Sequence, residues 1–131
     1  IDTQVNGDTI DSHFDLEKKI RGTSEDVIGG FRNQLKDMFA KKRVEEIEKS
    51  CIQQAYITLG NLMTVCAIEQ IDSCPMEGFL PHKVDEALNL SDKNLKSVLL
   101  LPVGFRAEDD FMSSMKKVRK PITQSVIDLD F

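Results

Sequence analysis

The residues best suited to chemistry form one short string, Cys74-Pro75-Met76-Glu77-Gly78, which follows the most apolar part of the chain. Proline and glycine around Met76 and Glu77 fix an unusual backbone path, and glycine lets a ligand approach the main chain closely. Amides that point outward there could hydrogen-bond the edge of a flat, polar cofactor. A plain connection between two helices fits the same residues, and spacing alone slightly favours that simpler interpretation.

A second candidate is the pair of cations Lys117 and Arg119 in the C-terminal tail. Because side chains alternate along an extended chain, residues two apart lie on the same side. Two cations on one side suit a phosphate group. An ordinary pair of surface cations is more common, so the spacing alone leaves both interpretations open.

No catalytic motif is present by spacing: the chain lacks GxSxG, HExxH, P-loop and GxGxxG sequences. Its histidines, His13 and His82, lie far apart in polar surroundings and are expected at the surface. The acidic run from Glu108 to Asp110 predicts a solvated turn. The three cysteines are an odd number without a CxxC spacing, which favours reduced thiols over disulfides or zinc. No residue is predicted to be catalytic or to bind a metal.

Composition limits the class of protein. A chain of 131 residues with 40% apolar and 30% charged residues is typical of one globular domain. Its 22 acids and 17 bases give a net charge of -5, which argues against binding nucleic acid. No unbroken apolar run approaches the roughly 20 residues that span a bilayer. We therefore expect a cytoplasmic protein that binds neither nucleic acid nor a membrane.

The N-terminal third predicts two helices. The first runs over residues 8–21 and stops at Gly22. A hydroxyl and a carboxylate at Thr23 and Asp26 match the capping pattern that opens a helix. The apolar stripe of that second helix comprises Val27, Phe31, Leu35 and Met38. The Gly29-Gly30 pair inside it weakens the prediction.

The longest helix is predicted over residues 44–69, where apolar residues recur every three or four positions. After Tyr56 its other faces become apolar too, so the helix must be enclosed by protein. The chain is short and offers few elements to surround it. We therefore expect a large subunit interface rather than an internal core.

The remaining elements are one helix, one strand and an arm. Pro81 predicts the start of a helix over residues 81–88. The apolar run within residues 95–103 predicts a strand buried on both faces. Residues 116–131 predict an extended arm with a terminal strand that lies on a partner. One strand and an arm are too few for a sheet, so either another chain completes the sheet or the sequence is incomplete.

Four segments of the chain form an ordered set: Gln53–Leu62, Ile71–Phe79, Leu99–Asp110 and Lys117–Pro121. In this order they resemble the nitroreductase family of flavin-dependent NAD(P)H oxidoreductases. Together they cover most of residues 50–121, which makes the resemblance far more specific than a single short motif. The first fifty residues are less distinctive but compatible.

The resemblance implies an α+β fold in which two subunits intertwine. In such a homodimer the central helices pack at the interface, and the C-terminal arm adds a strand to the partner's sheet. It also implies FMN at the interface. The implied cofactor contacts are the main chain of Pro75, Met76, Glu77 and Gly78 at the isoalloxazine, and Lys117 and Arg119 at the phosphate. No side chain of the chain is implied to be catalytic.

The implied reaction is ping-pong: hydride passes from NAD(P)H to the flavin, and the reduced flavin then reduces a nitroaromatic, a quinone or a similar small-molecule acceptor. Phe31 and Leu35 lie on the helix that resembles the family's substrate-covering one, which makes them weak substrate candidates. The sequence sets neither the physiological acceptor nor a preference for NADH or NADPH.

One feature of the family is missing from these residues. Members begin with an Arg-x-Ser-x-Arg type segment that grips the FMN phosphate and ribityl chain, and carry further flavin contacts from an Asn and a Lys. Residues 1–131 therefore resemble the C-terminal part of a single nitroreductase-like domain. Because the chain starts with Ile1, we expect it to be a fragment of a longer chain. The alternative is a non-catalytic dimerisation or binding module, from a truncated protein, that does not hold flavin.

Overall fold

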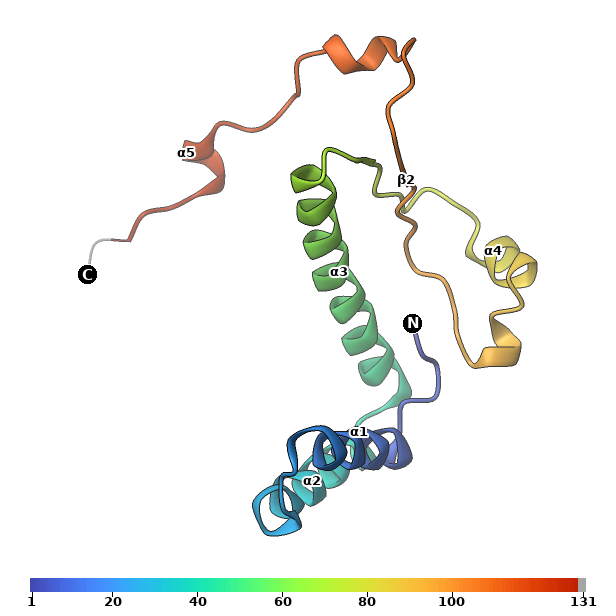
Figure 1. The fold of residues 1–131 in the computed structure, drawn as a ribbon, viewed down its shortest axis with the longest axis vertical. Coiled ribbons are helices and arrows are strands. Elements are labelled where there is room, and N and C mark those ends of the chain that lie inside the picture. The colour runs from blue at the N-terminus through green and yellow to red at the C-terminus, as the bar shows by residue number, and fades with distance from the viewer. Residues whose placement is uncertain (130–131) are drawn as a thin grey trace.

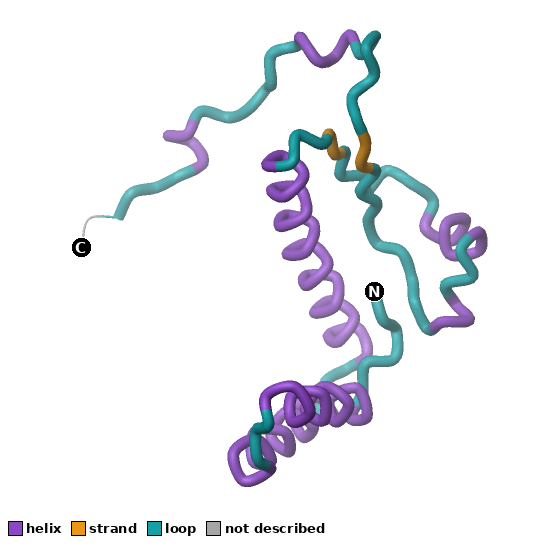
Figure 2. The backbone as a smooth tube through the Cα atoms, viewed as in Figure 1, coloured by secondary structure: helices purple, strands orange, loops and turns teal. Residues whose placement is uncertain are grey.

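The computed structural model describes residues 1–129, which form an α+β arrangement that is mostly helical with a small two-stranded sheet (Figures 1 and 2). The helices are α1 (Gly7–Arg21), α2 (Glu25–Ala40), α3 (Val44–Ile68), α4 (Pro81–Ala87) and α5 (Ile122–Ser125). The strands are β1 (Asp72–Ser73) and β2 (Val103–Gly104). Two short 3₁₀ helices are η1 (Ser91–Lys93) and η2 (Phe111–Ser114).

Helices α1 and α2 form an antiparallel hairpin that holds the buried residues of the described chain. Asn6 caps α1 by accepting hydrogen bonds from two backbone amides, and Gly22 ends it with φ 68°, a left-handed conformation that glycine adopts without strain. The predicted first helix is therefore confirmed. The cluster buried between the two helices consists of Ile10, Phe14 and Ile28, with Leu35 and Phe39 packed against it.

The predicted capping pattern at the start of α2 was wrong. The N-cap is Ser24 rather than Thr23, and no side chain caps the helix. Glu25 instead forms an ion pair with Lys18 of α1 at 2.8 Å. A Cβ at Gly29 would lie 3.0 Å from the Glu25 carboxylate. Glycine inside this helix therefore leaves room for the side chain that ties the two helices together.

Helix α3 is the long, apolar helix that the sequence predicted, but no residue in it is buried. Its exposed apolar residues lie on several faces: Val44, Tyr56, Ile57, Leu62, Val65 and Ile68. The helix packs on β1 at one end, and the N-terminal segment and the segment before β2 lie along one side of it only (Figure 1). The predicted enclosure is therefore not provided by residues 1–129.

By length and composition alone, α3 could cross a membrane. The absence of a long unbroken apolar run does not conflict with this, because the criterion of length and mean hydropathy also admits a helix in which polar residues are interspersed. One such helix is weak evidence, since the core helix of a soluble protein meets the same criterion.

The prediction of a continuous strand, buried on both faces, within residues 95–103 was wrong. Regular strand geometry is limited to β2, with isolated bridges at Leu95 to Asp2 and at Leu100 to Met76. The residues from Lys96 to Leu101 are only half-buried. A strand that is buried on both faces belongs inside a sheet with neighbours on both edges, and the described residues supply neighbours along one edge only.

The C-terminal arm leaves the rest of the fold after η2, as the orange-to-red part of Figure 1 shows. It is irregular except for α5, a single turn that begins after Pro121 and was not predicted. The expected terminal strand is not formed over residues 126–129, since a strand forms only against another strand. The last two residues of the expected strand, 130 and 131, lie outside the described part of the chain.

Candidate functional site

An antiparallel ladder anchors the loop that carries the predicted cofactor contacts. β1 pairs with β2, and the same register continues beyond both strands. The Cys74 amide donates to the Pro102 carbonyl at 3.0 Å, and Met76 and Leu100 exchange two hydrogen bonds of 2.8 and 3.0 Å. The chain from β1 to Met76 is therefore one extended segment held in a single register.

Two prolines explain why this ladder is not assigned as a longer strand. Pro75 lies between two residues whose amides face the opposite segment, so its own position faces outward and its missing N–H removes no ladder bond. Pro102 lies opposite Cys74. Its carbonyl accepts from the Cys74 amide, but proline has no N–H to donate to the Cys74 carbonyl. The ladder is thus short of one hydrogen bond at its centre.

The ladder ends at Met76, and the next two amides are left without a protein partner. Within residues 1–129, the backbone N–H groups of Glu77 and Gly78 donate to no protein acceptor, while the Glu77 carbonyl accepts from Phe79 at 3.0 Å. No atom lies within 4 Å of where a Cβ of Gly78 would stand. Two adjacent free donors beside open space fit the acceptor edge of a flat ligand.

The four predicted loop residues therefore lie together but are not equivalent. Both main-chain groups of Met76 are used by Leu100, so only its half-buried side chain remains available for further contacts. Pro75 has no N–H to offer. The amides of Glu77 and Gly78 are the donors that remain, so sequence alone could place this loop but could not assign its free donors.

The two predicted phosphate-binding cations lie on the arm, which runs away from the loop in Figure 1. Both Lys117 and Arg119 are exposed. The Arg119 guanidinium donates to the carbonyl of Val118 at 2.8 Å. One chain therefore does not bring the arm cations and the loop amides into one cavity.

The two substrate candidates lie on α2, at the opposite end of α3 from the loop (Figure 1). Phe31 is exposed and makes an edge-to-face contact with Phe14, with ring centroids 5.9 Å apart. Leu35 packs against the buried cluster of the hairpin. The described residues thus give Leu35 a structural role, and a contact with substrate stays a prediction for both residues.

An ion pair at the start of the ladder was not predicted. The Arg106 guanidinium donates to both carboxylate oxygens of Asp72, at 2.5 and 2.8 Å. Asp110 lies 3.8 Å from the same guanidinium and accepts from the Met112 amide at 2.9 Å. The expectation of a purely solvated acidic run was wrong for Asp110, and its place just before an apolar pair was the signal for a helix cap.

These contacts shift the pKa values of the ionisable side chains near the ladder. The hydrogen bonds from Arg106 hold the pKa of Asp72 below its ordinary value of 3.8, and the charge on Lys117 adds a smaller effect in the same direction. The same pair raises the pKa of Arg106. On α4, hydrogen bonds from Ser97 lower the pKa of Asp85. Both carboxylates are therefore stabilised in their charged form.

The lowered pKa values predict a loss of stability in acid. Asp72 and Asp85 bind protons less readily in the folded chain than in the unfolded one. Their contribution is therefore fully present above the unfolded value of 3.8 and is lost as the pH falls through the lower folded values. Urea unfolding at about pH 6 and about pH 2.5 should show the decrease, and Asp72→Asn should make it smaller. An equal decrease in the variant would contradict the assignment to Asp72.

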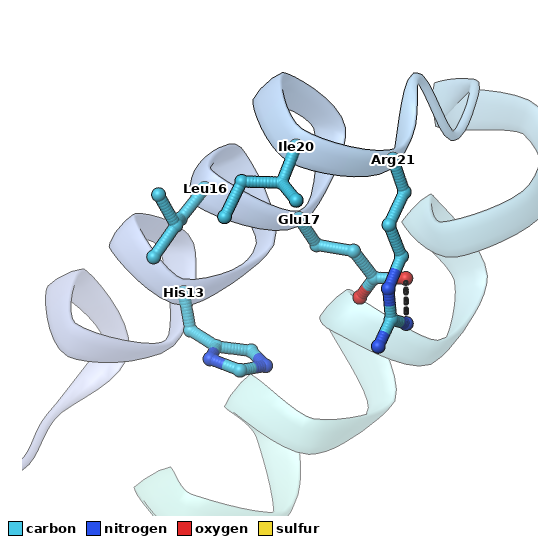
Figure 3. Close-up of a pocket in the computed structure, with 5 residues that line it drawn as sticks. All are labelled: His13, Leu16, Glu17, Ile20 and Arg21. Atoms are coloured by element: carbon cyan, nitrogen blue, oxygen red, sulfur yellow. Dashed lines mark hydrogen bonds and ion pairs between the residues drawn. The ribbon is translucent and has the colours of Figure 1, made fainter.

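Three of the hollows on the described surface have linings that differ in chemistry. A shallow pocket of about 190 Å³ on α1 has the apolar side chains of Leu16 and Ile20 and an ion pair between Glu17 and Arg21 at 3.2 Å (Figure 3). A hollow of about 620 Å³ surrounds the junction of β1 and β2. A groove of about 460 Å³ between α3 and the segment 99–101 is mostly apolar. Among the described residues, no three His, Cys, Asp or Glu gather as metal ligands.

Known proteins match this chain over the elements that build the ladder. The family model described as "Nitroreductase family" matches residues 26–105, more than half of the chain. The oxygen-insensitive NAD(P)H nitroreductase of Enterobacter cloacae is 31% identical over 74 residues, which are 56% of this chain and 34% of that protein. A Staphylococcus haemolyticus protein with NAD(P)H nitroreductase in its name is 32% identical over 124 residues, covering 86% of this chain and 55% of that protein.

The chain spans between about a third and about half of the length of these curated relatives. The matched range runs from α2 through the central helix α3 and the loop to the end of β2. This range contains the resembling segments Gln53–Leu62 and Ile71–Phe79 and the first part of Leu99–Asp110, and it ends before Lys117–Pro121. The chain belongs to the nitroreductase family.

Proposed function

We propose that the complete protein is an FMN-dependent NAD(P)H oxidoreductase that reduces nitroaromatics, quinones or related small-molecule acceptors. The observation that carries the proposal is the ladder, which ends at the free amides of Glu77 and Gly78 in a chain of this family. When bound, FMN supplies the hydride chemistry between NAD(P)H and the acceptor in two separate half-reactions.

The role of the chain is to bind and orient this cofactor. Main-chain groups of the Pro75–Gly78 loop would hold the isoalloxazine edge, with Glu77 and Gly78 as donors. Lys117 and Arg119 would hold the phosphate, since charge-assisted hydrogen bonds to phosphate are short and strong. The site needs no side-chain nucleophile, which agrees with the exposed and unpaired Cys74 beside the loop.

A homodimer is the second part of the proposal. Because one chain keeps its loop and its arm cations apart, a complete site would take the arm from one subunit and the loop from the other. The exposed apolar faces of α3 would then pack against the partner's α3. Within residues 1–129, the amides of Leu99 and Leu101 also have no partner, so this sheet edge can accept a further strand.

The cytoplasm is the compartment that we propose for the protein. Cys51, Cys66 and Cys74 form no disulfide with one another. Unpaired thiols are typical of a reducing compartment.

The experiment that tests this function uses the complete gene product. We expect a yellow protein with flavin absorbance that oxidises NAD(P)H only when a nitroaromatic or quinone is present. Light scattering should give the mass of a dimer. A colourless protein that takes up no added FMN would refute the proposal.

The alternative function is a non-catalytic dimerisation or binding module. The observation that favours it is the apolar surface of α3, of which no residue is buried within residues 1–129. Such a module would form a dimer and show no flavin uptake in the same two measurements. Sequencing of the coding region upstream of Ile1 separates the two functions further, because an Arg-x-Ser-x-Arg segment there supports the enzyme.

A further inference from the structure

Arg106 makes the ion pair that closes the open end of the ladder. Its guanidinium uses two nitrogens on the two oxygens of Asp72, at 2.5 and 2.8 Å. Asp72 is the first residue of β1 and lies opposite Gly104, the last residue of β2. A planar, two-point contact of this kind fixes orientation as well as distance.

The ladder needs such support because its backbone bonds are few. Each named strand has two residues, and Pro102 cannot donate at the centre. A slip of one residue would turn every side chain of the segment to the other face. It would also move the free amides of Glu77 and Gly78, because they follow the ladder directly.

The same guanidinium contacts the root of the arm. Asp110, 3.8 Å from Arg106, accepts the Met112 amide and so caps η2. Lys117 follows soon after η2, and its charge acts on Asp72. One side chain is therefore in contact with the start of the loop segment and with the turn from which the arm departs.

We infer that Arg106, held by Asp72 and Asp110, is a positioning residue that sets the register of the cofactor loop and the direction in which the arm leaves the fold. Its link to FMN rests on the proposed function. Its effect on the ladder does not, because the ladder bonds join backbone groups of the chain to one another.

The test compares Arg106→Gln with the unmodified complete protein. We expect hydrogen exchange at the amides of Cys74 and Met76, which donate across the ladder, to be about two- to fivefold faster in the variant. Exchange within α1 should be unchanged. FMN titrated into the variant should bind about two- to fivefold more weakly, with kcat reduced less than affinity.

The controls separate a positioning role from a general loss of charge. Arg43→Gln removes another exposed arginine that pairs with a carboxylate, Glu46, at 3.6 Å, and should alter neither measurement. The double variant Asp72→Arg, Arg106→Asp restores a pair with reversed charges and should recover slow exchange at Cys74 and Met76 only in part, because the new carboxylate at position 106 lies beside Asp110.

Two outcomes are decisive in different ways. Unchanged exchange at Cys74 and Met76 in Arg106→Gln would overturn the positioning role, whatever happens to flavin. Faster exchange in a complete protein that takes up no FMN would support the positioning role and refute the proposed function instead.

Discussion

Phe14→Ala is expected to lower the free energy of unfolding of the α1–α2 hairpin by about 3–5 kcal/mol, the range for truncation of a buried phenylalanine. Phe14 is only 4% exposed, in the cluster that it forms with Ile10 and Ile28. Arg32 lies over its ring at 5.5 Å from the centroid. Whole domains are stable by only about 5–15 kcal/mol, so the decrease should be a large share of the total stability. Urea unfolding followed by far-ultraviolet circular dichroism measures the change.

The matched control is Phe105→Ala, the same change at a side chain that is 90% exposed. Its effect should stay within about 0.5 kcal/mol, because surface substitutions rarely do more. Equal effects at Phe14 and Phe105 would show that the buried cluster does not stabilise the hairpin.

Arg119→Ala is expected to weaken FMN binding by roughly 1.5–3 kcal/mol, the range for a hydrogen bond to a charged group. This corresponds to a roughly tenfold to hundredfold higher Kd. The described hydrogen bond of Arg119 is to the carbonyl of its neighbour Val118, so the change should leave the fold intact. Quenching of FMN fluorescence during titration measures the affinity, and circular dichroism checks the fold.

Lys120→Ala is the matched control for this prediction, because Lys120 is an exposed cation next to Arg119 that is not assigned to the phosphate. It should change the Kd far less. Arg119→Lys should lie between, since lysine keeps the charge but loses the two-point geometry. Equal affinities of the Arg119→Ala variant and the unmodified protein would remove Arg119 from the proposed site.

The helices of this protein could be predicted from local sequence. Gly22 ends α1, and Pro81 begins α4 at its first position. The 3.6-residue period of α3 is carried by residues near one another in the chain. The start of α2 was placed less well, because Glu25 pairs with Lys18 of the neighbouring helix. A contact with another element there replaced the expected local cap.

The strands could not be predicted in the same way. Residues 95–103 are as apolar as a central strand, yet only β2 and two bridges formed. Pairing depends on whether another segment lies alongside, and the described chain supplies one edge only. The arm shows the same dependence, since residues 126–129 have no strand beside them.

The sequence by itself determined the family, the helices α1, α3 and α4, and the position of the loop that follows β1, because each depends on residues that lie close together along the chain. Only the tertiary structure decided which loop amides are free, because that depends on the pairing of Met76 with Leu100. It also decided the partner of Asp72, Arg106, which lies 34 residues further along the chain. Hydrogen bonds and ion pairs over such separations depend on how the chain folds back on itself, which local propensity does not encode.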